Sequence, residues 1–339
     1  MRSALTALAT LAVAAFVSAG PAIAAEPVPV RIGVIPVIGA APVFVANGEG
    51  GLKQAGLAPA FTTFESGPNM IQALASGTID VYVAGIAPLA VARTKNIDVR
   101  VVAATAVEEM VFVAGPKLAP YFAAGTDKAE ALRQFKAKEG RPARLATQPP
   151  GSVPNTTLQH WLWQVAKADK ADAQIVAMGI DATQQALLAG AVDGASIREP
   201  ALTIVQTRNP AMKLVATGAE MFPDQPGTVV AVSGAFADKN PAAVQGLVDA
   251  LVKATATLKS DPDKAAPAVE QALGKGITDL ATIRKAITSP AAKFTADPRA
   301  IVEATKAMQD YQVSIGTLDK AVPIDGLFVP GFYEKATAR

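Results

Sequence analysis

The chain has 339 residues, 50% of them hydrophobic and 18% charged, a composition that can bury two sizeable cores. It has no cysteine and one histidine, which excludes disulfides, thiolate metal sites, cysteine nucleophiles, a lipid-modified N-terminal cysteine and metal sites built from several histidines. The formal charge is only +2 and no basic run alternates with aromatic residues, so we expect no nucleic-acid partner.

The N-terminus has the pattern of an export signal. Arg2 supplies a positive start, Leu5 to Val17 is apolar but too short for a lasting membrane span, and Ala22-Ile23-Ala24 fits the small-x-small cleavage rule. We therefore expect residues 1–24 to be a signal peptide and the mature protein to reside in the periplasm. The alternative is an uncleaved anchor helix.

The next segments predict a β-α-β-α-β unit with a parallel sheet. Pro42 suits the first turn of a helix that runs to about Gly48, because its missing N–H has no partner to lose there. The expected strands are Pro29–Pro36, Ala60–Phe64, Asp80–Gly85 and Asp98–Ala104.

A second set of elements follows a strand at Met110–Ala114, near which we place the first crossing between two lobes. Its further strands are expected at Arg144–Thr147, Ala173–Met178, Asp193–Ile197 and Lys213–Thr217. Thr228–Val232 should cross back, and Asn240 should cap a long helix that opens with Pro241. The predicted organisation is lobe 1 from residues 25–112 and 227–339, with C-terminal helices, and lobe 2 from residues 113–226. Two hinge strands join the lobes.

One stretch occurs twice. Gln72–Asp80 and Gln185–Asp193 share Gln, Ala, Leu, Gly and Asp in register. Each predicts the last turns of a helix, a glycine stop and a short strand, followed by a turn that contains proline. Ligands of α/β units sit beyond the carboxyl ends of the strands, so two such loops predict two similar lobes around one shared site. The alternative is chance similarity in a chain rich in Ala, Leu and Gly.

These features together resemble the periplasmic solute-binding proteins of ABC transporters, in the branch that serves nitrate, sulfonates, taurine and thiamin-precursor pyrimidines. The resemblance covers nearly all of the mature chain. It rests on the order of several short matches: Arg31-Ile32-Gly33, Ala41-Pro42 with Gly50-Gly51-Leu52, Gln72 to Asp80, Gly85 to Pro88, Gly151-Ser152, Asp193 to Pro200, Thr228-Val229-Val230 with Phe236, and Lys239-Asn240-Pro241. It implies a type II fold in which two α/β lobes close on a ligand like a flytrap. An aromatic residue often precedes the Glu-Pro of the second loop in this family, whereas this chain has Arg198.

Helix N-termini are the expected ligand-binding elements, because their free N–H groups and the helix dipole favour anions. The alternative for each of them is an ordinary helix cap. The candidate residues at these starts and at the neighbouring loops are Gly39, Ala40, Ala41, Ser66, Gly67, Ile86, Ala87, Gln148, Ser152, Val153 and Asn155.

Arg198, Glu199 and Glu108 complete the candidate site, with Glu109 as the alternative to Glu108. Arg198 could pair bidentately with a sulfonate, carboxylate or phosphate, or instead form a salt bridge at the rim, for example with Glu199. Glu108 or Glu109 could accept a ligand ammonium, or both could be solvated residues of the hinge.

The resulting hypothesis is a periplasmic receptor that delivers a small organic anion or zwitterion, sulfonate- or taurine-like, or nitrate, to the permease and ATPase of an ABC importer. We expect a monomer, no cofactor and no metal. The alternatives are a ligand-sensing domain that partners a membrane receptor, and an uptake receptor for a heterocycle such as a thiamin-precursor pyrimidine. An enzyme is not expected. The related fungal pyrimidine synthases imply a cysteine-rich iron-binding motif, which a chain without cysteine lacks.

Overall fold

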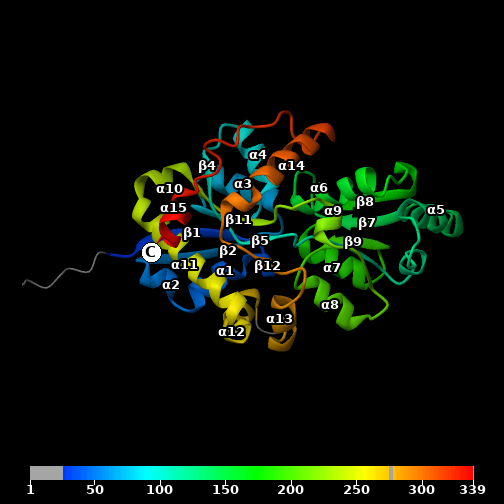
Figure 1. Cartoon of the computed structure of the whole chain (residues 1–339), viewed down its shortest axis with the longest axis horizontal. Coiled ribbons are helices and arrows are strands. Elements are labelled where there is room, and N and C mark those ends of the chain that lie inside the picture. Colours follow the sequence, from blue (N-terminus) through cyan, green and yellow to red (C-terminus); the bar gives the residue numbers. More distant parts are fainter. Residues whose placement is uncertain (1–25, 275–277, 339) are drawn as a thin grey trace, which may run out of the picture.

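The computed structural model describes residues 26–274 and 278–338. The predicted signal peptide, residues 1–24, lies outside the described residues. Two α/β lobes lie side by side along the long axis of the molecule (Figure 1). No helix among the described residues is both long and apolar enough to cross a membrane.

The first lobe is built on a five-stranded sheet with the order β2-β1-β3-β11-β4. Strands β1, β2 and β3 are parallel, whereas β11 runs antiparallel to β3 and β4 on either side of it. The strands are β1 (Val28–Val34), β2 (Leu57–Thr63), β3 (Val81–Gly85), β4 (Val99–Ala104) and β11 (Thr228–Ser233).

The second lobe repeats this plan. Its sheet, written in the matching direction, has the order β8-β7-β9-β6-β10, with β7 parallel to β8 and β9 and with β6 antiparallel to β9 and β10. The strands are β6 (Val111–Ala114), β7 (Ala143–Thr147), β8 (Ala173–Ala177), β9 (Gly194–Ile197) and β10 (Lys213–Ala216). In both lobes the single antiparallel strand is thus the one that comes after a crossing of the chain.

Helices cover both sheets. Those of the first lobe are η1 (Ile38–Ala40), α1 (Ala41–Gly48), α2 (Gly51–Gln54), α3 (Gly67–Ala75), α4 (Ala87–Thr94), α10 (Gly234–Lys239), α11 (Pro241–Ser260), α12 (Pro262–Leu273), α13 (Leu280–Ile287), η5 (Pro298–Ile301), α14 (Val302–Ser314) and α15 (Gly331–Thr337). Those of the second lobe are η2 (Ala119–Tyr121), α5 (Lys128–Glu139), α6 (Val153–His160), the π-helix η3 (Trp161–Val165), η4 (Lys170–Asp172), α7 (Ile180–Leu188), α8 (Ala201–Arg208) and α9 (Gly218–Met221).

Buried aliphatic residues of the strands, with α1, α11 and α12, form the core of the first lobe. In the second lobe, Trp161 stacks on Phe112 at 4.6 Å between ring centroids, on one face of the sheet. A separate cluster that includes Leu187 and Val205 covers the other face. The two-lobed α/β fold predicted from the repeat is therefore confirmed.

The chain passes between the sheets twice. The chain leaves the first sheet after Ala104 and enters the second sheet at Val111. It returns between Ala216 and Thr228. The first passage also contains β5 (Ala106–Val107), which forms a short antiparallel pair with β12 (Lys293–Phe294) that the sequence did not predict.

The start of α11 differs from the expectation. Asn240 precedes Pro241 as predicted, but its side chain caps no N–H group of α11. Its amide donates instead to the carbonyl of Phe236, at 3.3 Å, because the preceding helix α10 ends directly beside it.

Candidate functional site

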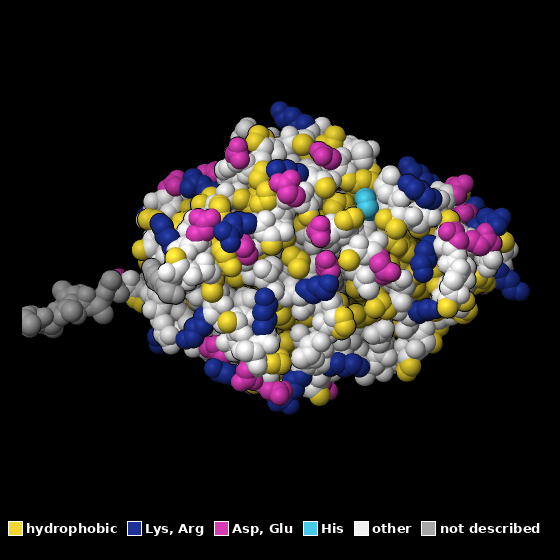
Figure 2. Space-filling view, viewed as in Figure 1, with side chains coloured by type: hydrophobic (Ala, Val, Ile, Leu, Met, Phe, Trp, Pro, Cys, Tyr) yellow, Lys and Arg dark blue, Asp and Glu magenta, His cyan; other side chains and the backbone are white. Residues whose placement is uncertain are grey.

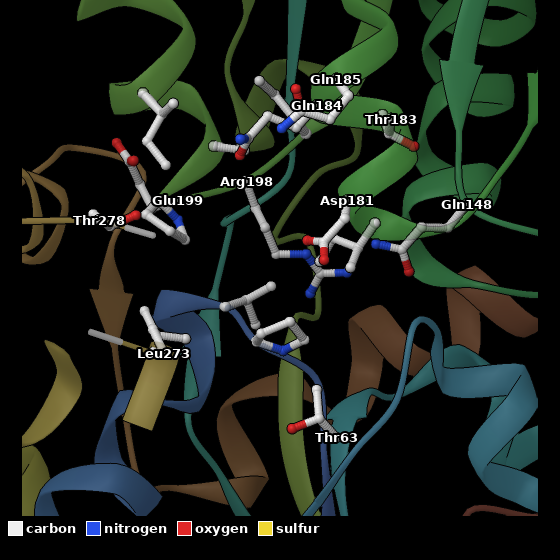
Figure 3. A pocket seen from close by; sticks show the side chains of 18 of the residues that line it. Thr63, Gln148, Asp181, Thr183, Gln184, Gln185, Arg198, Glu199, Leu273 and Thr278 are labelled. Carbon is white, nitrogen blue, oxygen red and sulfur yellow. The ribbon is translucent and has the colours of Figure 1, made fainter. Parts of the chain in front are cut away.

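A cavity of about 430 Å³ lies between the lobes. Pro36 and Val37, in the loop after β1, and Thr63 at the end of β2 line one side of it, and Leu273 at the end of α12 contributes to the wall. Thr278, between α12 and α13, also lines it, and the second lobe supplies the other polar groups, which are Gln148, Asp181, Thr183, Gln184, Gln185, Ser196, Arg198 and Glu199. In Figure 3 the polar ends of Arg198, Asp181 and Gln148 lie near one another, and Glu199 lies apart from them. The volume suits a small organic molecule.

Arg198, directly after β9, is 3% exposed and pairs with a residue that we expected elsewhere. Its Nη1 donates to Glu109 Oε1 at 2.8 Å and to the Thr228 hydroxyl at 3.3 Å. The Thr228 hydroxyl in turn donates to the same Glu109 oxygen at 2.6 Å. The salt bridge is thus buried and made with Glu109, rather than at the rim with Glu199.

Gly39 has a structural reason to be glycine. A Cβ at this position would lie 2.0 Å from Glu109 Oε2 and 2.8 Å from the Thr228 hydroxyl, so the close approach of the carboxylate requires its absence. Ala40 and Ala41 are fully buried in the same first turn. The helix start predicted to receive a ligand anion therefore lies against a carboxylate of the protein itself.

The second predicted helix start, at α3, is an ordinary cap. Ser66 is fully buried, and its hydroxyl accepts from the N–H of Asn69 at 3.4 Å. A Cβ on Gly67 would lie 2.5 Å from the hydroxyl of Tyr82, so Gly67 allows the helix to approach that tyrosine. Neither residue lines the cavity between the lobes.

The third predicted helix start, at α6, belongs to the contact between the lobes. Ser152 caps Asn155 at 3.3 Å, and its hydroxyl donates to the carbonyl of Pro149. Val153 packs in the core of the first lobe, beside Gly85 at the end of β3. Ile86 and Ala87, at the start of α4, are buried in the same core. These residues belong to the contact between the lobes and do not line the cavity.

The two predicted acidic residues outside the ion pair also have partners within the protein. Glu199 accepts from the N–H and the hydroxyl of Thr203, both at 3.0 Å. Burial raises the pKa of Glu199, while hydrogen bonds from Ser289 and Thr203 act in the opposite direction. Glu108 pairs with Lys293 and lines a second cavity, on the side of α8 and α9.

The sequence analysis missed the N-terminus of α7, which supplies Asp181 and Thr183 to the cavity. The repeat contained the signal, because α7 is the counterpart of α3 and the two helix starts face each other. The N–H of Ile180 donates to the carbonyl of Glu65 at 3.3 Å across the cleft. The predicted residues that line the cavity are Gln148, Arg198 and Glu199.

Within the described residues, no group of three or more histidine, acidic or cysteine side chains is placed to hold a metal ion. On the face shown in Figure 2, basic and acidic side chains are interspersed and no field of one sign covers it.

Two α/β lobes around a shared cavity define a two-lobed solute-binding fold. The NMT1-like family matches residues 23–273, so the chain belongs to this family. The family resemblance found in the sequence is thereby confirmed.

Solved structures share the whole architecture at low sequence identity. The periplasmic nitrate-binding protein NrtA from Synechocystis is 14% identical with a TM-score of 0.78, over 92% of this chain and 89% of that one. The alkanesulfonate-binding protein SsuA from Xanthomonas axonopodis, bound to MOPS, is 21% identical with a TM-score of 0.71, over 91% and 100% of the two chains. A mutant of DSZB in complex with biphenyl-2-sulfinic acid is 14% identical with a TM-score of 0.63, over 92% and 99%.

One curated protein is related over part of the sequence. The nitrate import ATP-binding protein NrtC from Synechococcus elongatus is 30% identical over 134 residues, which are 40% of this chain. The match spans only 20% of that longer protein.

Proposed function

We propose that the chain is a periplasmic substrate-binding protein that delivers a small organic anion or zwitterion to an ABC importer. The observation that carries the proposal is the cavity of about 430 Å³ to which both lobes contribute. A ligand that touches both lobes stabilises the arrangement in which they are close together, and this arrangement is what a permease can recognise.

The ligand class is proposed on chemistry and on likeness. The cavity offers one guanidinium, several amides and hydroxyls, and apolar walls from Pro36, Val37 and Leu273. Such a lining suits a molecule with a short carbon chain and a polar head. Solved structures similar to this one include proteins named for nitrate and for alkanesulfonates, so we would screen sulfonate- and taurine-like compounds and nitrate first.

A thermal-shift screen of the mature protein tests the proposal, with sulfonates, nitrate, amino acids, dicarboxylates and pyrimidines as ligands. A ligand that binds only the native state at a hundredfold excess over its Kd raises the free energy of unfolding by about 2.7 kcal/mol. We expect a clear rise in Tm with one class of small organic anions or zwitterions. A protein that none of these compounds stabilises would contradict the proposal.

Two matched variants then locate the binding site. Gln148→Ala removes an amide that lines the cleft cavity, whereas Gln206→Ala removes one from the second cavity. Loss of a hydrogen bond to a charged ligand costs about 1.5–3 kcal/mol, or roughly a tenfold to hundredfold loss of affinity. Calorimetry should show this loss for Gln148→Ala only, and equal affinities in both variants would place the ligand elsewhere.

A further inference from the structure

The position where the cleft could bind an oxyanion is already filled by the protein. The Arg198 guanidinium and the Thr228 hydroxyl converge on Glu109 Oε1, at 2.8 and 2.6 Å. The other carboxylate oxygen, Oε2, lies against Gly39 and has no hydrogen-bond partner among the described residues. Glu109 itself is 2% exposed. The guanidinium, the hydroxyl and the close backbone are the groups that would otherwise receive a sulfonate or nitrate.

This arrangement sets the charge of the cavity. Arg198 lines the cavity, but its positive charge is already matched by Glu109 at a buried site, where ion pairs are little screened. The Glu199 carboxylate accepts two hydrogen bonds from Thr203. Asp181 is the remaining charged side chain of the lining, and among residues 26–274 and 278–338 it has no ion-pair or hydrogen-bond partner. The lining therefore carries a net negative charge.

We propose that Glu109 is the specificity-determining residue of the cleft: its carboxylate acts as a resident anion that holds Arg198, so that the cavity selects a ligand with an ammonium group for Asp181 over a simple anion. This inference rests on the proposed function and narrows its ligand class to zwitterions. A second anion beside Glu109 and Asp181 meets like charge on two sides, and this repulsion rejects it. A zwitterion instead places its cationic end at Asp181 and its acidic end at the free edge of Arg198 and at Gln148.

The first test compares two ligands of nearly the same shape. 2-Aminoethanesulfonate and ethanesulfonate differ only by the ammonium group, and nitrate serves as the smallest anion. Calorimetry on the wild type should show the amino compound binding at least about tenfold more tightly. In Asp181→Asn this preference should disappear. Equal or tighter binding of ethanesulfonate to the wild type would overturn the proposal.

The second test needs no transported ligand. Glu109→Ala leaves a space beside an unpaired Arg198, so formate or nitrate should raise the Tm of this variant and leave the wild type unchanged. Glu108→Ala is the matched control, because Glu108 pairs with Lys293 outside the cleft cavity. Glu109→Gln, which fills the space without the charge, should bind ethanesulfonate more tightly than the wild type does, and it serves if Glu109→Ala fails to fold.

The outcomes of the two tests are separable. If formate or nitrate raises the Tm of Glu109→Ala and not that of Glu108→Ala, the role of Glu109 as a resident anion is supported, even where neither sulfonate binds. In that case only the proposed transport ligands are wrong. If these anions do not raise the Tm of Glu109→Ala, or raise that of Glu108→Ala equally, the inference is overturned even if the wild type proves to be a solute receptor.

Discussion

The two copies of the repeated segment fold in the same way. Gly77 and Gly190 stop their helices with φ of 69° and 67°. In the first copy Thr78 N donates to Ala73 O at 2.8 Å, and in the second Ala191 N donates to Ala186 O at 2.9 Å. Each copy then enters the central parallel strand of its sheet.

Asp80 and Asp193, the last residues of the two copies, also make equivalent hydrogen bonds. Asp80 accepts from the backbone N–H and the guanidinium of Arg31, which lies in the neighbouring strand β1. Asp193 accepts from the N–H of Arg144 in the equivalent strand β7, and from the guanidinium of Arg141. The repeat is therefore a scaffold that ties a helix end to two strands.

The copies differ in the loops that come after their strands. After β3, the small apolar loop from Gly85 to Pro88 packs against Val153 of the other lobe. After β9, Arg198 and Glu199 bring charge into the cleft and find partners there. The same scaffold thus carries a loop that contacts the other lobe in one copy and a loop that lines the cavity in the other.

The largest expected effect separates the two aspartates. Asp193→Ala should cost about 3 kcal/mol of unfolding free energy, since it removes a buried carboxylate and leaves a guanidinium and a strand N–H without their acceptor. Asp80→Ala should cost about 1 kcal/mol, since its arginine is half exposed. Urea unfolding measures both. The two tryptophans, Trp161 and Trp163, lie in the second lobe and report on it by fluorescence. Equal losses of unfolding free energy would contradict this prediction and show that the two aspartates stabilise their lobes to the same extent.

The contact loop is tested by Gly85→Ala. The new Cβ would lie 2.7 Å from Val153 Cγ2, so the methyl group pushes the lobes apart and should weaken ligand binding about tenfold. The double variant Gly85→Ala/Val153→Ala provides the space and should restore the affinity measured by calorimetry. Persistence of the defect in the double variant would mean that the glycine matters for another reason.

The two stop glycines should respond equally. Gly77→Ala and Gly190→Ala should each cost about 1 kcal/mol, because both residues have positive φ and a Cβ at either would meet nothing within 4 Å. Thermal unfolding of both variants measures the loss. If the two losses of stability differ by more than about 1 kcal/mol, the two glycines lie in different environments.

The smallest effect concerns pH and a histidine of the second lobe. Burial lowers the pKa of His160 from 6.5, against a hydrogen bond to the carbonyl of Met221. Its ring meets Tyr311 of the first lobe at 5.0 Å between centroids. The unfolded chain therefore binds a proton more readily than the native one, and stability falls as the pH drops from 6.5 through the lowered value. Tm measured from about pH 8 to about pH 5 should decline more in the wild type than in His160→Gln. If Tm falls with pH equally in the wild type and in His160→Gln, His160 does not contribute to the pH dependence of stability.

The sequence was sufficient for the scaffold and insufficient for the site. Hydrophobic runs and the repeat predicted every strand of the two five-stranded sheets to within a few residues, because the inner strands of both sheets are buried and the two repeat helices end in glycine. The short pair β5–β12 has two residues on each side and leaves no pattern to read. The partner of Arg198 could not be predicted either, because Glu109 reaches it only through the space that Gly39 leaves open, and that space exists only in the folded chain.

The way the sheets are completed has a consequence for the order of assembly. All five strands of the second sheet lie in one continuous stretch, from Val111 to Ala216. The first sheet lacks the strand between β3 and β4 until β11, Thr228–Ser233, has joined it. As the chain emerges from the ribosome, the segment in the middle of the sequence can finish its sheet before the segment that precedes it. The half of the molecule that begins first is therefore the half that is completed last.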